Sequence, residues 1–299
     1  MANPIDVVIL TESRYLNPIN KTPYVTNVLL EDKLVQKALE EEGLTVVRKD
    51  WADSDFDWSS TNAVLFRTTW DYFDRIEEFK LWLERVEGKT KAINPISQIR
   101  WNMDKWYLKD LEEKGIPVVE TLYLHRGEKR SLKVILKSSG WEDAILKPTV
   151  AGGGRHTYRI NPQTAKELES TFSELIGNED LMLQPFQTSI QLKGEVSLIV
   201  IGGVFTHSIL KKAKSGDFRV QDDFGGSVHE YKASTVEVAF AERVVAVCEP
   251  VPSYARVDVM WNIENQLVVS EVELIEPELW FREYPEAAKV LARQIKNSL

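Results

Sequence analysis

Charged and glycine-rich residues that suit a bound triphosphate follow one another along the last two thirds of this chain. Lys105 comes first, and Lys147-Pro148 then precedes the run Gly152-Gly153-Gly154-Arg155. Three consecutive residues without a Cβ let the backbone approach a ligand closely and turn its N–H groups toward anionic oxygens, while the flanking cations add positive charge. The run does not match the Walker pattern G-x-x-x-x-G-K-[ST], and on local evidence a simple hairpin turn is an equal alternative.

Three carboxylates near the C-terminus indicate a cation site. Asp258 lies in one strand-like segment, and Glu271 and Glu273 lie in the next. A two-residue loop at Glu264-Asn265 would place Asp258 opposite Glu271, with Glu273 on the same face, although a three-residue loop would shift this register. Gathered carboxylates repel one another unless a cation compensates, and hard oxygen ligands suit Mg²⁺, whereas the alternative is a solvated sheet face. The other face would be buried and mostly apolar: Val257, Val259, Trp261, Val268, Ser270, Val272 and Leu274.

The surrounding sequence predicts elements that would hold these residues. The run Ala144-Ile145-Leu146 reads as a short buried strand that delivers Lys147-Pro148 at its end. Residues 101–114 read as one helix that carries Lys105. Strands and helices alternate farther along the chain, and helices are expected near residues 162–176, 236–247 and 278–297.

The first hundred residues predict a different kind of sheet. Strand-like and helix-like segments alternate there as in βαβ units, which favours an open parallel sheet with helices on both faces. Asn94-Pro95 reads as a linker that ends this domain. The expected strands cover residues 5–10, 44–47 and 63–66, and the expected helix covers residues 27–42.

Ligands of such sheets bind at the carboxyl ends of the strands, which makes two segments candidates for a substrate pocket. Residues 11–14 follow the first strand, and residues 67–72 follow the strand that ends at Phe66. Arg67 is predicted to pair with a substrate carboxylate, and Trp70 or Tyr72 to form a wall. A helix N-cap at Asp71 or Asp74 is the alternative for the aspartates.

Composition indicates a cytoplasmic enzyme with real hydrophobic cores. The chain has 299 residues, 43% of them apolar, which suggests two domains or three small ones. Its single cysteine, Cys248, fits a reducing compartment, and no segment reads as a signal peptide or a membrane span. A formal net charge of −9 argues against nucleic acid as a partner, and the four histidines lack the spacing of zinc ligands.

Taken together and in order, these motifs resemble the ATP-grasp superfamily from about Asn102 to the C-terminus. The similarity is greatest to the glutathione-synthetase-like ligases and, within them, to the O-ureido-D-serine cyclo-ligase group that makes D-cycloserine. The segments that carry the resemblance are Lys105, Ile145 to Pro148 with the Gly152 to Arg155 run, Leu183 to Phe186, Gly194-Glu195, Lys211, Arg219 before Gly225-Gly226, Arg256 to Asp258 and Glu271 to Pro277, together with Arg67 to Tyr72 for the cyclo-ligase group.

The resemblance implies how a nucleotide would be held. Lys105 and Lys147 would contact its phosphates, and Gly152, Gly153 and Gly154 would form a flexible lid over them. The adenine would meet the backbone of a hinge, and Glu195 would hold the ribose. The hinge residues are Gln184, Pro185 and Phe186, although the Gln184 side chain can equally serve packing alone.

The resemblance also implies the reacting groups. Lys211 and Arg219, with Arg256, would neutralise the transferring γ-phosphate. Two Mg²⁺ ions, with Mn²⁺ as an alternative, would be held by Asp258, Glu271 and Glu273. The last of these positions is often Asn in the superfamily, so the site here carries one more negative charge. The substrate side would be formed by Arg67, Thr69, Trp70, Asp71 and Glu276.

We therefore predict an α/β protein of the ATP-grasp fold, with an N-terminal open parallel sheet at residues 1–100 and two α+β lobes, 101–187 and 188–299, that clasp ATP. The predicted activity is ligation of a carboxylate to an amine through an acyl-phosphate, with release of ADP and phosphate. Both groups can belong to one small molecule, in which case the product is a ring. The alternatives are a small-molecule phosphotransferase and a non-catalytic nucleotide-binding protein. The predicted partners are small molecules, with neither nucleic acid nor membrane, and a homo-oligomer is left open.

Overall fold

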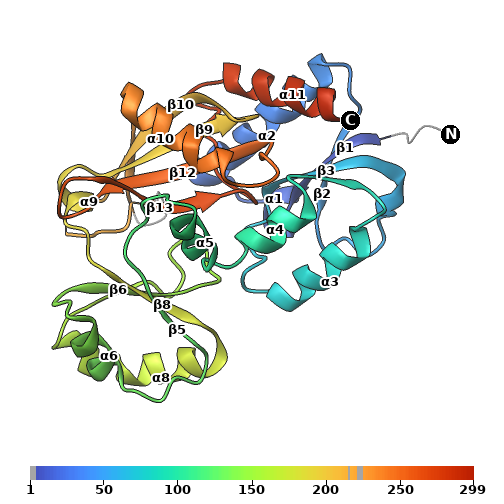
Figure 1. The fold of residues 1–299 in the computed structure, drawn as a ribbon. Coiled ribbons are helices and arrows are strands. Elements are labelled where there is room, and N and C mark those ends of the chain that lie inside the picture. Colours follow the sequence, from blue (N-terminus) through green and yellow to red (C-terminus); the bar gives the residue numbers. More distant parts are fainter. Residues whose placement is uncertain (1–4, 215, 221–224) are drawn as a thin grey trace.

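The computed structural model describes residues 5–214, 216–220 and 225–299, which form three sheets with helices packed on them (Figure 1). The N-terminal sheet has the order β2-β1-β3-β4, and its strands are all parallel. Its elements are β1 (Ile5–Thr11), α1 (Ser13–Leu16), α2 (Pro23–Glu41), β2 (Val46–Asp50), the 3₁₀ helix η1 (Trp58–Ser60), β3 (Thr61–Thr68), α3 (Ile76–Val86), β4 (Lys91–Ile93) and α4 (Ile96–Asn102). The predicted open parallel sheet is confirmed.

The other two sheets are antiparallel, with the orders β5-β8-β6-β7 and β11-β10-β9-β12-β13. The central part contains α5 (Tyr107–Glu113), β5 (Leu122–Leu124), α6 (Leu132–Ser139), β6 (Ala144–Pro148), β7 (Tyr158–Ile160), α7 (Thr164–Glu167), α8 (Glu169–Asn178) and β8 (Leu181–Pro185). The C-terminal part contains α9 (Ser189–Leu192), β9 (Glu195–Ile201), β10 (Val204–Lys212), β11 (Ser227–Glu230), α10 (Thr235–Ala246), β12 (Tyr254–Trp261), β13 (Leu267–Glu273) and α11 (Glu286–Ser298). These parts have the predicted α+β character.

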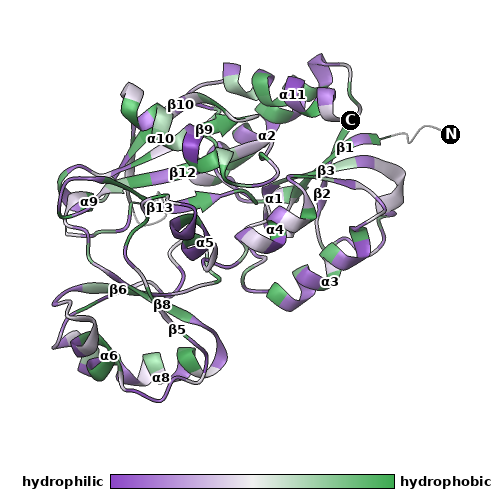
Figure 2. Cartoon of the chain, in the orientation of Figure 1, coloured by the Kyte–Doolittle hydropathy of each residue, from purple (hydrophilic) through white to green (hydrophobic). Residues whose placement is uncertain are grey.

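One hydrophobic core joins the N-terminal and C-terminal sheets. Side chains of β1 and α2 pack in it against β9, β12 and α11. Separate cores lie between the N-terminal sheet and α3 and α4, between the C-terminal sheet and α5 and α10, and inside the central lobe. Figure 2 shows hydrophobic and hydrophilic residues alternating along α3 and α11, as expected for helices with one buried face. Among the described residues, no helix has the length and apolar composition needed to cross a membrane.

The helix predicted at residues 101–114 is wrong. Helix α4 ends at Asn102, and α5 begins at Tyr107. Lys105 lies in the turn between them, where its backbone N–H donates to the Thr149 carbonyl at 2.9 Å. The Asn102 side chain donates to the Val272 carbonyl of β13 and accepts the backbone N–H of Leu274. Helical periodicity in the sequence does not reveal such tertiary contacts.

Three other boundaries differ from the prediction for local reasons. Helix α2 begins four residues early, because the Thr22 hydroxyl caps it and Pro23 occupies its first position. The last helix begins only at Glu286, after an irregular segment. Asn94 is not part of a linker, since it is fully buried and its side chain donates to the carbonyls of Tyr254 and Leu274 at 2.9 Å.

Candidate active site

A cavity of about 950 Å³ lies where the three parts of the chain meet. Its lining includes every predicted site residue except Arg67 and Thr69, and of the two alternatives for an aromatic wall it includes Trp70 and not Tyr72. The predicted residues that line it are Trp70, Asp71, Lys105, Lys147, Gly152, Gly153, Gly154, Gln184, Pro185, Phe186, Glu195, Lys211, Arg219, Arg256, Asp258, Glu271, Glu273 and Glu276. Residues more than two hundred positions apart in the sequence are thus gathered around one space large enough for a nucleotide and a small substrate.

The glycine-rich loop closes one side of this cavity. Gly153 and Gly154 have φ angles of +55° and +72°, which L side chains rarely adopt. A Cβ on Gly152 would lie 2.6 Å from the Phe73 ring, so this position has no room for a side chain. Arg155 contacts Asp74 of the N-terminal domain at 3.2 Å and Glu179 of the central lobe at 2.9 Å. The loop therefore lies against both the sheet domain and the central lobe.

Two lysines lie beside the loop, Lys105 buried and Lys147 half-buried. The Lys105 ammonium donates to the Ala151 carbonyl at 2.5 Å and pairs with Glu271 at 3.0 Å. Burial lowers the pKa of Lys147, and the neighbouring Lys105 acts in the same direction while Glu271 opposes it. These cations and the backbone N–H groups of the loop form a wall that suits phosphate oxygens.

The opposite end of this wall is apolar and aromatic. Phe186 is mostly buried, the Arg159 guanidinium lies 3.7 Å from its ring centroid, and Phe218 meets it edge-on at 6.0 Å. The Gln184 side chain donates to the Thr121 hydroxyl at 2.9 Å, which agrees with the packing alternative for that side chain. Sequence reasoning missed Val119, Ile145, Ile190 and Met260, which also line this end. A single apolar residue in a strand, a helix or a connecting segment carries no sequence signal that separates a pocket from a core.

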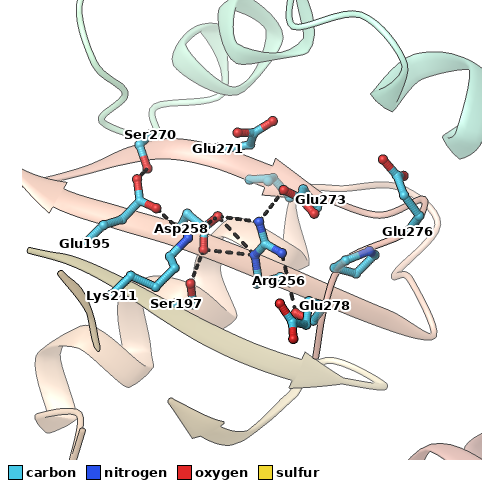
Figure 3. A network of polar contacts seen from close by, with 12 residues as sticks. Glu195, Ser197, Lys211, Arg256, Asp258, Ser270, Glu271, Glu273, Glu276 and Glu278 are labelled. Carbon is cyan, nitrogen blue, oxygen red and sulfur yellow. Dashed lines mark hydrogen bonds and ion pairs between the residues drawn. The ribbon is translucent and has the colours of Figure 1, made fainter. Parts of the chain in front are cut away.

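A network of largely buried charges lines the cavity (Figure 3). Asp258 accepts bonds from Arg256 at 2.8 Å and from Ser197, and it pairs with Lys211 at 3.2 Å. Burial raises the pKa of Asp258, but Arg256 and Lys211 outweigh it and lower the value to about 2. Lys211 also pairs with Glu195 at 2.5 Å. Asp258 is therefore ionised and fully occupied by protein partners.

The wall formed by β13 and the residues after it is more acidic. Glu271 and Glu273 have side chains that are 28% and 24% exposed, in contrast to 2% for Asp258. Burial raises the pKa of Glu273 to about 7 although Arg256 pairs with it, and burial together with Glu273 raises the pKa of Glu276. This wall holds more carboxylates than its cations neutralise, so it would stabilise an added cation.

The hairpin that presents these carboxylates has the predicted register at Asp258, which lies opposite Glu271. Nearer the turn, a bulge shifts the pairing, so that Val259 lies opposite Val269 and Ser270 is the extra residue. The prediction for the buried face is therefore wrong at two positions. Val268 packs with Met260 outside the main core, and Ser270 faces the cavity, where its hydroxyl donates to Glu195 at 2.9 Å.

The predicted metal triad is not assembled. Across residues 5–214, 216–220 and 225–299, no group of three His, Cys, Asp or Glu side chains is arranged to hold a metal ion. The reason is that the Asp258 carboxylate is turned toward Arg256 and Lys211, as Figure 3 shows, while Glu271 and Glu273 face the open cavity.

The N-terminal domain forms the remaining wall. The Trp70 indole donates to the Glu276 carbonyl at 2.9 Å and meets the Tyr15 ring edge-on at 5.5 Å. Asp71 accepts bonds from the Trp51 indole and from Arg75, each at 2.7 Å. The N-cap alternative for the aspartates is wrong, because α3 is preceded by Arg75 and has no side-chain cap.

The predicted contact between Arg67 and a substrate carboxylate is not possible in this arrangement. Arg67 is 1% exposed, its guanidinium donates to the Pro277 carbonyl at 3.0 Å, and it does not line the cavity. Thr69 is fully buried and is also absent from the lining. Arg67 is the last residue but one of β3 and Thr69 follows the strand, and Pro277, which comes after β13, contacts Arg67.

Comparison with known proteins assigns the chain that forms this cavity to a family. Residues 97–256, more than half of the chain, match the prokaryotic glutathione synthetase ATP-grasp domain. The chain belongs to the ATP-grasp ligases. It is therefore an ATP-dependent ligase that forms C–N bonds, which confirms the predicted family and class of enzyme.

Relatives of this ATP-grasp ligase resemble it over nearly the whole chain. Residues 7–94 match the N-terminal domain of the D-cycloserine synthetase DcsG. The cycloserine biosynthesis protein DcsG of Streptomyces lavendulae is 30% identical over 252 residues, which cover 79% of this chain and 83% of that protein. These matches confirm the similarity to the cyclo-ligase group.

Solved structures agree with this assignment of the ATP-grasp fold. The crystal structure of the D-cycloserine synthetase DcsG has a TM-score of 0.86 and 26% identity, and the match covers 98% of this chain and 99% of that one. The macrocyclase MdnC of Microcystis aeruginosa, bound with the precursor peptide MdnA, has a TM-score of 0.65 and 13% identity over 98% of this chain and all of that one. Because the identity to MdnC is only 13%, the likeness to that protein concerns the fold alone.

Proposed function

We propose that this ligase activates the carboxylate of a small substrate as an acyl-phosphate and joins it to an amine. The observation that supports this most strongly is that Lys211 and Arg256 line the same cavity as Lys105 and Lys147 and as the aromatic and acidic residues of the N-terminal domain. A γ-phosphate that reaches them from one side would meet a carboxylate that enters from the other. Arg219 lines the same cavity and would add a third cation.

The proposed reaction has two steps. A carboxylate oxygen bonds to the γ-phosphorus as the bond from that phosphorus to ADP breaks. The amine nitrogen then bonds to the acyl carbon, phosphate leaves, and the amine proton passes to it. Lys105, Lys147 and Lys211 hold positive charge near the oxygens on which negative charge develops, and this preorganised electrostatic effect requires no acid–base pair in the first step.

The substrate end of the cavity suits an amine. Glu12, Asp71 and Glu276 line it together with the rings of Tyr15, Tyr24 and Trp70. Acidic and aromatic groups stabilise a cationic or hydrogen-bond-donating nitrogen. If carboxylate and amine belong to one molecule, as the likeness to a cycloserine synthetase suggests, the product is a ring.

The residues present fit a divalent cation at Glu271 and Glu273, where the carboxylates exceed the neighbouring cations. Glu271 and Glu273 would hold Mg²⁺ there, and the bound ion would supply positive charge that neutralises phosphate oxygens. Asp258 would join these two ligands only by giving up contacts with Arg256 or Lys211. We therefore assign Glu271 and Glu273 as the principal metal ligands. Asp258 instead holds the Arg256 and Lys211 side chains in place.

The proposed division into lobes at residues 1–100, 101–187 and 188–299 places one sheet in each lobe. We also propose that the enzyme acts in the cytoplasm. Its single cysteine, Cys248, is buried, and burial raises the pKa of the thiol to about 11, which keeps it unreactive.

The acyl-phosphate is tested by trapping. A screen of small amino acids for Mg²⁺-dependent ADP release identifies acids that support turnover. With such an acid, added hydroxylamine should yield the hydroxamate at the rate of ADP release, because a strong small nucleophile intercepts a mixed anhydride. An analogue that lacks the internal amine is the control, since its acyl-phosphate cannot cyclise.

A different outcome would support a different chemistry. ADP release with a stable phosphorylated product and no hydroxamate, for every acid that supports turnover, would contradict the ligase mechanism and favour phosphotransfer to a hydroxyl group.

Replacing Lys147 with alanine should weaken ATP binding by at least about ten-fold, or about 1.4 kcal/mol. The reason is that a half-buried cation beside the glycine loop would be lost, while the melting temperature without ligand should change little. Calorimetric titration with Mg-ATP measures the effect, and the exposed Lys166 replaced by alanine is the matched control. Unchanged affinity would remove Lys147 from the nucleotide site.

A further inference from the structure

The segment between β13 and α11 supplies a wall of the cavity without being a helix or a strand. Glu276, Glu278 and Trp280 of this segment line the cavity. Trp280 has a φ angle of +48°, a conformation that bulky L residues rarely adopt without support from their surroundings. Its ring centroid lies 5.6 Å from the Lys211 ammonium and 5.1 Å from the Arg256 guanidinium. The Trp280 ring therefore packs against both central cations.

Two charged residues of the N-terminal domain hold this segment from behind. The Glu31 carboxylate accepts the backbone N–H groups of Phe281 and Arg282, each at 3.0 Å and each on a different oxygen. Arg67 donates to the Pro277 carbonyl at 3.0 Å, lies 3.8 Å from Glu31 and has its guanidinium 5.5 Å from the Phe281 ring centroid. The first part of the segment is thus bound to β3 through Arg67, and the last part is bound to α2 through Glu31.

Glu31 and Arg67 are costly to bury and do not touch the cavity. They are 2% and 1% exposed, and neither belongs to the cavity lining. Burial of a charged pair adds little to the stability of the folded state compared with apolar side chains of the same size. What the pair does provide is a fixed set of bonds to the backbone of a segment whose conformation is strained at Trp280 and whose other face lines the cavity.

We propose that Glu31 and Arg67 are positioning residues, which fix residues 276–282 against the N-terminal domain and so hold Trp280 against Lys211 and Arg256. The proposal rests on the proposed function only in taking this cavity as the site of reaction. Its tests need neither the carboxylate nor the amine substrate and no turnover, so its failure is distinguishable from failure of the ligase mechanism.

The test compares Glu31→Gln and Arg67→Lys with matched surface variants. Glutamine offers one acceptor oxygen and turns an amide donor toward the second backbone N–H, while lysine cannot bond Pro277 and Glu31 as the guanidinium does. The controls are Glu41→Gln on the exposed side of α2 and Arg85→Lys on the exposed side of α3.

Two measurements report on the segment itself. Hydrogen exchange of a peptide covering residues 275–285 should become at least about ten-fold faster in both positioning variants, because a backbone bond is lost. In protein labelled with 5-fluorotryptophan, the Trp280 resonance, assigned with Trp280→Phe, should shift or broaden. Peptides of the central lobe and the affinity for Mg-ATP should stay within about three-fold of the unsubstituted protein, as should both controls.

Each remaining outcome would overturn the proposal. Unchanged hydrogen exchange at residues 275–285 and an unchanged Trp280 resonance in both folded variants would show that the segment keeps its conformation without the bonds from Glu31 and Arg67. Exchange that rises equally throughout the chain, or loss of cooperative folding in both variants, would assign Glu31 and Arg67 to global stability instead.

Discussion

Replacing Glu271 with glutamine should lower ATP-dependent turnover by at least about 100-fold, while the protein still folds. Glu271 lines the open cavity together with Glu273, and it lies 3.0 Å from the Lys105 ammonium. Although burial opposes ionisation, Lys105 and Lys147 lower the pKa of Glu271, so it is charged at neutral pH. Glutamine keeps an acceptor for Lys105 but removes the charge that a divalent cation requires.

Turnover should be measured as ADP release over a series of Mg²⁺ concentrations, together with the melting temperature of the ligand-free protein. The melting temperature should change by no more than a few degrees, since the substitution preserves shape and relieves repulsion with Glu273 and Asp258. Glu264→Gln, at the exposed turn of the same hairpin, is the control. Normal turnover of Glu271→Gln at limiting Mg²⁺ would exclude Glu271 as a ligand.

Replacing Lys211 with methionine should lower turnover by about 10²- to 10³-fold and weaken ATP binding by much less. Lys211 is buried between Glu195, at 2.5 Å, and Asp258, at 3.2 Å. Burial lowers the pKa of its ammonium, but Asp258 and Glu195 outweigh burial and raise it, so the group keeps its charge. A fixed charge of this kind stabilises the transferring phosphoryl group most in the transition state, which separates its effect on turnover from that on binding.

Single-turnover ADP release and Mg-ATP titration, performed on the same preparation, measure the two effects. Lys212→Met is the control, because Lys212 is the next residue of β10 and its side chain is exposed. Lys211→Met leaves Asp258 and Glu195 with fewer partners, so a lower melting temperature is expected as well. Equal losses in binding and turnover would mean that Lys211 serves only to bind the nucleotide.

Local sequence was sufficient to predict the elements that hold most of the site. Short apolar runs between helix-like segments predicted the parallel strands of the first domain. The hairpin of β12 and β13 was predicted from strand-like segments on either side of a turn, where every second residue lies on the same face. The glycine run and the lysine before it predicted a loop for an anionic ligand from backbone freedom and charge alone. The order of these motifs along the chain, more than any one of them, identified the ATP-grasp family.

Tertiary contacts decided what several of these residues do. Arg67 lies near the end of β3, at the edge where ligands of parallel sheets bind, yet it is buried, because Glu31 and the segment after β13 enclose it. Asp258 has the predicted register, but Arg256 and Lys211 occupy its carboxylate and leave the open cavity to Glu271 and Glu273. Sequence periodicity reports which face of an element a residue occupies. The partner that covers this face comes from a distant part of the chain, and only the folded structure shows whether a charged side chain there meets a ligand or another side chain.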